Sequence, residues 1–448
     1  MQRTAKHKYF EFIAFMLMAS TFLPLLFNNL PPFVKSHHIW TVIWGISLIT
    51  SYLKIFSNKT IKHVLVYGLI MIISMFTVWN QIDDWNFQLL INEFYNIFIG
   101  ASVIAYFFES KDYFGLARIT RWSIIFLFIT AIMTIISSTI DPMYARNIVG
   151  MASVSNEAEI ESILSLRYLG GGNYSTALSF MCLFPVFFYF YKNTGISIIS
   201  KRMIIITSIV FFLALSGMQI FTNVLIAIVI IIISIIGIKK LKQSIMGISL
   251  LLFIIIFTPN EVFVNGINSI GGYFKEGSEL NYKFTDLARF IEIGSKIEDK
   301  TTTVGLRGDR YFQLSESFFQ SPLLGCYFLS ENNNAHGYLN YNLAYGKSVT
   351  QVEGTHLHWM NKLTVTGLFI FVVFFYILYS FLKNNINRFN STYKFYYVIS
   401  SLALLSYGLF KTFGGKEAWY TFFILLPGIY YLPLLKKGNS NFNLNPQK

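Results

Sequence analysis

The chain has 448 residues, of which 54% are hydrophobic and only 13% are charged, with a formal net charge of +13. A soluble globular protein carries about 25% charged residues, so this composition excludes an ordinary soluble domain. Stretches of roughly 18 to 20 apolar residues recur along the sequence, and each can cross about 30 Å of hydrocarbon as a helix. Because a spanning segment must satisfy its own backbone hydrogen bonds, we expect an all-α polytopic membrane protein.

About twelve segments are apolar enough to be candidate spans. Nine of them fall within residues 1–258 and three within 360–435, followed by a polar tail at 436–448. The first segment has no small-residue cleavage site after it, so we interpret it as a span and not as a removed signal peptide. In chain order the candidates are 9–28, 39–56, 64–80, 88–108, 122–140, 174–191, 203–216, 220–238, 244–258, 360–382, 395–411 and 418–435.

The basic residues follow the positive-inside pattern if the N-terminus is cytoplasmic. Every inner segment then carries a group of lysines and arginines, whereas the short outer loops carry almost none. This pattern predicts that both termini are cytoplasmic, and it explains the positive net charge by topology and not by nucleic-acid binding. The inner groups are Arg3, Lys6, Lys8; Lys54, Lys59, Lys62; Lys111, Arg118, Arg121; Lys192, Lys201, Arg202; Lys239, Lys240, Lys242; Lys383, Arg388, Lys394; and Lys436, Lys437, Lys448.

Two predicted outer loops, 141–173 and 259–359, are too long to be simple connections. The second contains aromatic and apolar residues throughout, which indicates a folded segment. Within it, residues at helical spacing predict a short amphipathic helix that ends at Ser321-Pro322 and lies on the membrane surface or against the bundle. The residues of its expected face are Tyr311, Leu314, Ser315, Phe318 and Phe319.

Arginines in these outer loops are candidates for binding an anionic, lipid-linked substrate. Arg167 lies in the first loop, and Arg307 and Arg310 lie in the second. A guanidinium group donates two parallel hydrogen bonds to a phosphate, which the point charge of a lysine does not. The alternative is that a long translocated loop has a solvated basic surface.

Two histidines, His356 and His358, immediately precede the tenth candidate span. A histidine at the mouth of a membrane cavity can accept a proton from a hydroxyl group near neutral pH. The alternatives are an ordinary surface histidine, or a metal site in which His336 is the only further candidate ligand. We expect no metal.

One acidic residue, Glu93, falls inside a candidate span, where a charge is by default functional or paired within the bundle. The sequence contains no P-loop and no Gly-x-Gly-x-x-Gly motif that opens a helix, so we expect no nucleotide and no other cofactor. The run Gly170–Gly172 is interpreted as a flexible turn, with a phosphate cradle as the alternative.

Taken together, these features resemble the superfamily of O-antigen polymerases and O-antigen ligases of bacterial envelopes. Segment 305–311 (GLRGDRY), followed by 318–325 (FFQSPLLG), is similar to the family's arginine, helix and Pro-Leu-x-Gly turn. His356 and Gly367 resemble the histidine and glycine on either side of the start of the tenth span. Arg167 resembles the arginine of the family's other long loop.

The resemblance implies an enzyme of the bacterial cytoplasmic (inner) membrane that transfers glycans from undecaprenyl diphosphate. His356, Arg307 and Arg310 would be catalytic, and Arg167, His358 and Tyr311 would join the two arginines in binding the diphosphate and glycan. Energy would arrive with the substrate, so no nucleotide would be needed. The family also implies a chain-length regulator and a flippase as partners. Two departures from its pattern are Leu357, where a small polar residue is usual, and Ser216–Gln219, where a Ser-Arg pair is usual.

Three functions are compatible with the sequence. The first is a polymerase that joins lipid-linked oligosaccharide repeats into O-antigen of lipopolysaccharide or into a capsule. The second is a ligase that transfers finished glycan to lipid A core. The third is a flippase or another transporter of lipid-linked sugars, although a transporter would concentrate charge within the bundle and not in one outer loop.

Overall fold

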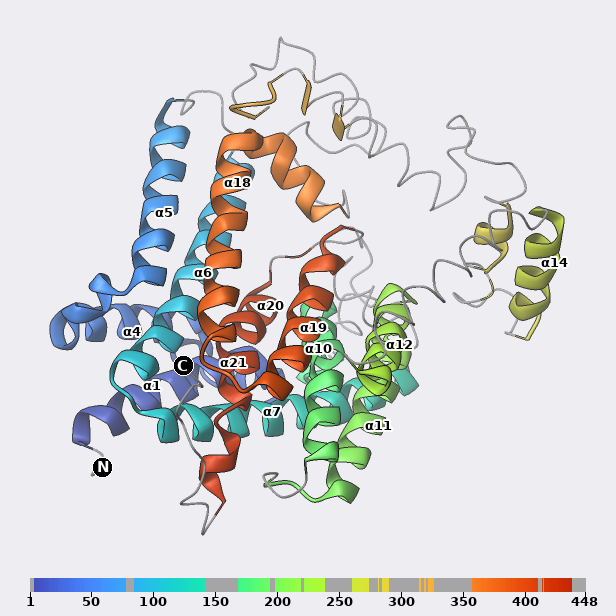
Figure 1. Ribbon diagram of the computed structural model, residues 1–448, viewed down its shortest axis with the longest axis horizontal. Coiled ribbons are helices and arrows are strands. Elements are labelled where there is room, and N and C mark those ends of the chain that lie inside the picture. The colour runs from blue at the N-terminus through green and yellow to red at the C-terminus, as the bar shows by residue number, and fades with distance from the viewer. Residues whose placement is uncertain are drawn as a thin grey trace.

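The structure is a computed structural model that describes residues 4–77, 84–141, 168–193, 198–218, 221–237, 260–273, 281, 284–289, 314–315, 318–319, 321–325, 357–409, 413 and 415–436. The described residues are largely helical and contain no strand (Figure 1). The ninth candidate span, 244–258, and most of both predicted outer loops lie outside these residues.

A helix lies at every candidate span within the described residues. Within the described part of the chain, four helices are long and apolar enough to cross a membrane: Ile91–Glu109, Tyr113–Ile140, Tyr174–Lys192 and His358–Ile386. The chain is therefore an all-α membrane protein. The helices at the candidate spans are α1 (Ala5–Phe22), α4 (His37–Ser51), α5 (Lys59–Thr77), α6 (Asp84–Glu109), α7 (Tyr113–Ile140), α10 (Tyr174–Lys192), α11 (Lys201–Gly217), α12 (Phe221–Ile236), α18 (His358–Ile386), α19 (Ser391–Tyr407) and a final run formed by α20 (Lys416–Tyr420), η5 (Thr421–Leu425), α21 (Leu426–Ile429) and η6 (Leu432–Leu435).

Short elements connect some of these helices. The first connection contains α2 (Pro24–Asn28) and α3 (Pro32–Lys35), and η1 (Leu53–Ser57) precedes α5. The first described helix of the predicted large loop is α14 (Asn260–Gly271).

Helices α5, α6 and α18 run along one another on one side of the molecule, and α10, α11, α12 and α19 pack together on the other (Figure 1). Helix α7 runs across the lower part of the view, where it contacts α1 and α11. The final helical run lies between the two groups and is buried on all sides, which is the expected place for a helix that is apolar all round.

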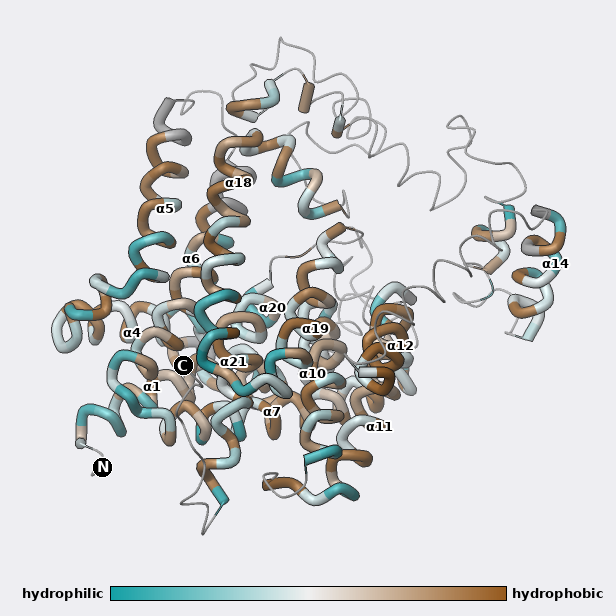
Figure 2. Tube along the Cα trace, in the orientation of Figure 1, coloured by the Kyte–Doolittle hydropathy of each residue, from teal (hydrophilic) through white to brown (hydrophobic). Residues whose placement is uncertain are grey.

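Many large apolar side chains are exposed on the outside of the molecule, on helices whose trace is coloured hydrophobic in Figure 2. In a soluble monomer such patches would be unusual, but hydrocarbon is their natural solvent. On α11 and α12 they include Ile205, Ile209, Leu213, Leu225, Val229 and Ile232.

Candidate functional site at the start of α18

Helix α18 is broken at Gly367, where the sequence predicts an uninterrupted span over 360–382. The backbone at Gly367 has φ +72° and ψ 169°, a conformation that glycine adopts without steric cost. The break separates 358–366 from 368–386, and the second part still reaches about 28 Å at 1.5 Å per residue. The two parts run in different directions (Figure 1). The start of α18 is therefore free to lie over the bundle while the rest can cross a membrane.

The turn that contains Pro322 and Gly325 docks on this break. A helix that restarts leaves its first N–H groups without partners in the helix. Here the N–H of Leu368 donates to the carbonyl of Pro322 at 2.8 Å, and that of Phe369 donates to the carbonyl of Leu323 at 3.5 Å. Irregular backbone at membrane depth is tolerated when it is buried in protein, and this turn supplies that cover.

A residue of the predicted amphipathic helix contacts the first part of α18. The hydroxyl of Thr364 donates to the carbonyl of Leu314 at 3.0 Å, and the Leu314 side chain is fully buried. Phe319, expected on the same apolar face, is instead 75% exposed. The expected face is therefore only partly buried.

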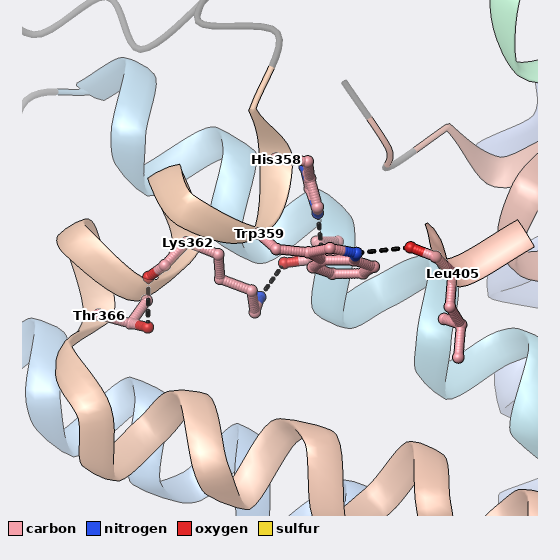
Figure 3. A network of polar contacts seen from close by, with 6 residues as sticks. His358, Trp359, Lys362, Thr366 and Leu405 are labelled. Atoms are coloured by element: carbon pink, nitrogen blue, oxygen red, sulfur yellow. Dashed lines mark hydrogen bonds and ion pairs between the residues drawn. The ribbon is translucent and has the colours of Figure 1, made fainter. Parts of the chain in front are cut away.

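Glu93 has the partners that the sequence alone could not identify. The Lys362 ammonium forms an ion pair with Oε2 of Glu93, and Nε2 of His358 lies 3.3 Å from Oε1. His358 and Lys362 are one helical turn apart, so both side chains leave the same face of α18 toward α6 (Figure 3). All three residues are largely buried, and an intramembrane charge with such partners marks a functional or organising site.

Aromatic groups surround this ion pair. The Lys362 ammonium lies 4.1 Å from the ring centre of Phe374, within the range of a cation–π interaction. Trp359 donates its indole N–H to the carbonyl of Leu405 at 2.6 Å (Figure 3). The backbone N–H of Trp359 donates to the carbonyl of Gly408 at 3.1 Å. These bonds attach the start of α18 to the end of α19.

A second buried polar group connects α1, α4 and α20. His37 Nδ1 lies 2.8 Å from the hydroxyl of Ser20, and its Nε2 lies 3.0 Å from that of Tyr420. Lys416 donates to the carbonyl of Ser20 at 3.0 Å. Next to Lys416, the carboxylate of Glu417 accepts from the side-chain amide of Asn173 at 3.1 Å.

Both polar groups lie at helix ends that the charge pattern predicts to face outward: the end of α1 and the beginnings of α4, α6, α10, α18 and α20. The rings of His38 on α4 and Tyr95 on α6 lie 5.8 Å apart, which brings the two groups together. Side chains far apart in the sequence thus form one polar region at one end of the bundle.

Several of the sequence candidates lie outside the described residues: Arg167, Arg307, Arg310, Tyr311, His336 and His356. His358 is described, and its polar neighbour is Glu93. Within the part of the chain that the structure describes, no three His, Cys, Asp or Glu side chains gather to hold a metal ion.

The glycine run after Arg167 is closely packed. Gly170 has φ +73°, and a β-carbon there would come within 2.2 Å of the backbone nitrogen of Leu25. The N–H of Gly172 donates to the hydroxyl of Thr134 at 2.7 Å. This N–H is therefore occupied by a protein partner.

No protein-family model matches this sequence, and no curated protein is significantly similar to it.

Sequence reasoning missed Lys362, His37, Lys416 and Glu417. Lys362 carried a usable signal, because it is a charge inside the candidate span 360–382, as Glu93 is inside 88–108. Lys416 was assigned to a short outer loop, where its burial could not be anticipated.

Proposed function

We propose that this chain is a polymerase that joins undecaprenyl-diphosphate-linked oligosaccharide repeats by inverting glycosyl transfer at the outer face of the bacterial inner membrane. The product would be O-antigen or capsular polysaccharide. The proposal includes the full predicted topology, with twelve spans, a large outer loop before the tenth and cytoplasmic termini.

One observation carries most of the support. The Pro322–Gly325 turn and the Gly367 break are two of the segments through which the sequence resembles glycan polymerases and ligases. They are about forty residues apart in the sequence, yet they contact each other through backbone hydrogen bonds. The ion pair of Glu93 and Lys362 lies on the same first part of α18.

The proposed reaction is a single displacement. An acceptor hydroxyl of one repeat attacks the anomeric carbon of another, and the bond from that carbon to the diphosphate oxygen breaks. His356 takes the proton of the hydroxyl, and the diphosphate leaves with the bonding electrons. Arg167, Arg307 and Arg310 bind the diphosphate and stabilise its developing charge, with Tyr311 and His358 contacting diphosphate or glycan. The stereochemical result of this single displacement is inversion of configuration at the anomeric carbon.

Glu93 and Lys362 act in this proposal as positioning residues. His356 lies two residues before His358, so the chain can separate their Cα atoms by at most roughly 7 Å. By holding the first turn of α18 against α6, the ion pair limits where His356 can lie. A catalytic base must be held within hydrogen-bond reach of its hydroxyl, and such anchoring serves that need.

Transport of a lipid-linked sugar is the second candidate, because Glu93, Lys362 and Glu417 are buried charges in the bundle. Polymerisation is favoured because Lys362 is paired with Glu93 and because these charges gather at one end of the bundle. Transporter sites lie typically near the membrane midplane. Glycan ligation shares the chemistry of polymerisation and differs in the acceptor.

Deletion of the gene in its host separates these functions on a gel of the surface glycan. A polymerase predicts single repeats on the core or surface acceptor and no ladder. Polymer that accumulates on undecaprenol would instead indicate a ligase, and repeats trapped on the inner leaflet would indicate a flippase. Either of these two results overturns the proposal.

A further inference from the structure

Helices α10, α11 and α12 enclose an apolar groove with a volume of about 410 Å³. This size is within the range of about 300–1,000 Å³ that is common for small-molecule sites. We call it the α10–α12 groove. Its lining includes Phe184, Phe188 and Tyr191 of α10, Ile205 and Ile209 of α11, and Ile231 of α12.

The groove has almost no polar wall. Two serines line it, Ser208 and Ser234, and each donates its hydroxyl hydrogen to the carbonyl four residues earlier in its own helix, at 2.8 and 2.6 Å. Ile205 and Ile209 are about half exposed, so the groove opens toward the outside of the bundle. In a membrane protein this opening faces hydrocarbon, and the groove therefore suits an alkyl chain.

One end of the groove is basic. The Lys192 ammonium lies 4.5 Å from the ring centre of Phe188, and the Lys201 ammonium lies 5.4 Å from that of Tyr191. Both rings line the groove, so both cations lie at its mouth. Arg202 follows Lys201 at the exposed start of α11. These cations lie at the C-terminus of α10 and the N-terminus of α11. The positive-inside pattern assigns these two helix ends to the cytoplasmic side.

No acidic residue occurs anywhere between 162 and 260, so none of the three helices offers a carboxylate to these cations. Helix α19, which packs against α10, has none either. The basic mouth is thus complementary to an anion, while the groove behind it is complementary to an alkyl chain.

We propose that the α10–α12 groove binds an anionic phospholipid of the cytoplasmic leaflet. One acyl chain lies in the groove, and the phosphate contacts Lys192, Lys201 and Arg202. Basic pockets between spanning helices on this side of a membrane recognise such headgroups. This site lies at the opposite helix ends from the polar region around Glu93, and it does not depend on the proposed glycosyl transfer.

Native mass spectrometry of the full-length protein in detergent tests this site. The probes are phosphatidylglycerol and phosphatidylcholine with the same acyl chains. We expect retained phosphatidylglycerol and much weaker retention of phosphatidylcholine. Each cation near a headgroup changes affinity by about fivefold. The triple variant K192Q/K201Q/R202Q should therefore lose roughly a hundredfold in phosphatidylglycerol affinity.

A matched control removes three exposed lysines elsewhere on the predicted cytoplasmic side, in K54Q/K59Q/K62Q, and should retain the wild-type affinity. A second test variant, Ser208→Phe, fills the groove and leaves the cations in place; it should also lose the retained lipid. Monodisperse elution on gel filtration establishes that each variant is folded.

Three results would overturn the proposal. The first is equal retention of the two lipids, which indicates non-selective solvation of the surface. The second is equal affinity of K192Q/K201Q/R202Q and its control. The third is a dimer that Ser208→Phe dissociates, which would identify a second copy of the chain as the occupant.

Discussion

Gly367 and Gly325 lie so close together that a β-carbon on Gly367 would come within 2.5 Å of the backbone nitrogen of Gly325. The converse also holds, because a β-carbon on Gly325 would come within 2.7 Å of the backbone nitrogen of Gly367, and within 2.0 Å of the carbonyl oxygen of Val365. Both glycines have positive φ, +72° and +86°. The contact between the loop and α18 therefore requires glycine at both positions, for conformation and for space.

Substitution Gly367→Ala should weaken this contact. The backbone conformation at Gly367, with φ +72° and ψ 169°, is essentially restricted to glycine and costs about 1–3 kcal/mol for a residue with a β-carbon, and the clash with the turn adds to it. We expect a lower thermal unfolding temperature of the purified protein in detergent. Gly45→Ala is the matched control, because Gly45 lies in α4 with nothing within 4 Å of an added β-carbon, and alanine favours helix. An unfolding temperature of Gly367→Ala at or above that of the control contradicts the described contact.

Removal of one partner of the Glu93–Lys362 ion pair should destabilise the protein more than removal of both. A buried charge left without its partner costs about 3–5 kcal/mol, whereas a neutral pair of similar volume is tolerated. We therefore expect Glu93→Gln and Lys362→Met each to lower the unfolding temperature, and E93Q/K362M to recover much of the loss. Additive losses in the double variant would show that the two side chains do not interact.

Trp359→Phe keeps most of the aromatic volume but removes the indole N–H that donates to the Leu405 carbonyl. The expected destabilisation is about 1 kcal/mol for the lost hydrogen bond, and more if the carbonyl stays buried without a partner. Trp122→Phe is the control, because that indole is 39% exposed on α7. Equal unfolding temperatures of the two variants would argue against the bond between α18 and α19.

His356→Ala should abolish the glycan ladder in cells, because loss of a general base reduces the rate about 10²–10⁴-fold. His63→Ala, on α5 and outside the polar region, is the control and should give a full ladder. A full ladder from His356→Ala, at normal protein abundance, excludes the proposed role of this histidine.

Glu93→Gln gives a separate test of positioning. If Glu93 positions His356, this variant should lower kcat with little change in the KM for the lipid-linked donor, and without moving the pH at which activity rises. A purely structural defect would lower the amount of folded enzyme but leave kcat per folded molecule unchanged. Purified enzyme and a synthetic polyprenyl-diphosphate oligosaccharide allow this measurement.

Arg307→Lys and Arg310→Lys should each have lower activity than the wild-type enzyme, although the positive charge is kept. Lysine cannot make the paired hydrogen bonds of a guanidinium group with a diphosphate. We expect the KM for the donor to rise at least tenfold in each arginine variant, compared with the control Lys283→Gln, which changes a lysine of the same predicted loop. Wild-type KM values in both arginine variants would remove these residues from the site.

The sequence alone determined the class of fold. Apolar stretches of the length of a bilayer must be helical, because hydrocarbon offers no partners for backbone N–H and C=O groups. Where the structure describes the candidate spans, helices lie at all of them; most ends differ by a few residues, but α7 begins at Tyr113, nine residues before the predicted start. The twelve-span count, the cytoplasmic termini and the roles of His356, Arg167, Arg307 and Arg310 stay predictions.

Tertiary structure decided what lies next to what. The sequence shows that Glu93 is a charged residue within an apolar span. Its partner Lys362 lies on a helix more than 250 residues later, and no local sequence pattern predicts that the two side chains meet. Likewise, the family resemblance marks Gly367 as a motif glycine, but the sequence does not show that the helix breaks there or that the Pro322–Gly325 turn packs against it. Helix formation in a bilayer follows from local composition and solvent, whereas ion pairs and helix breaks depend on which segments meet when the chain packs.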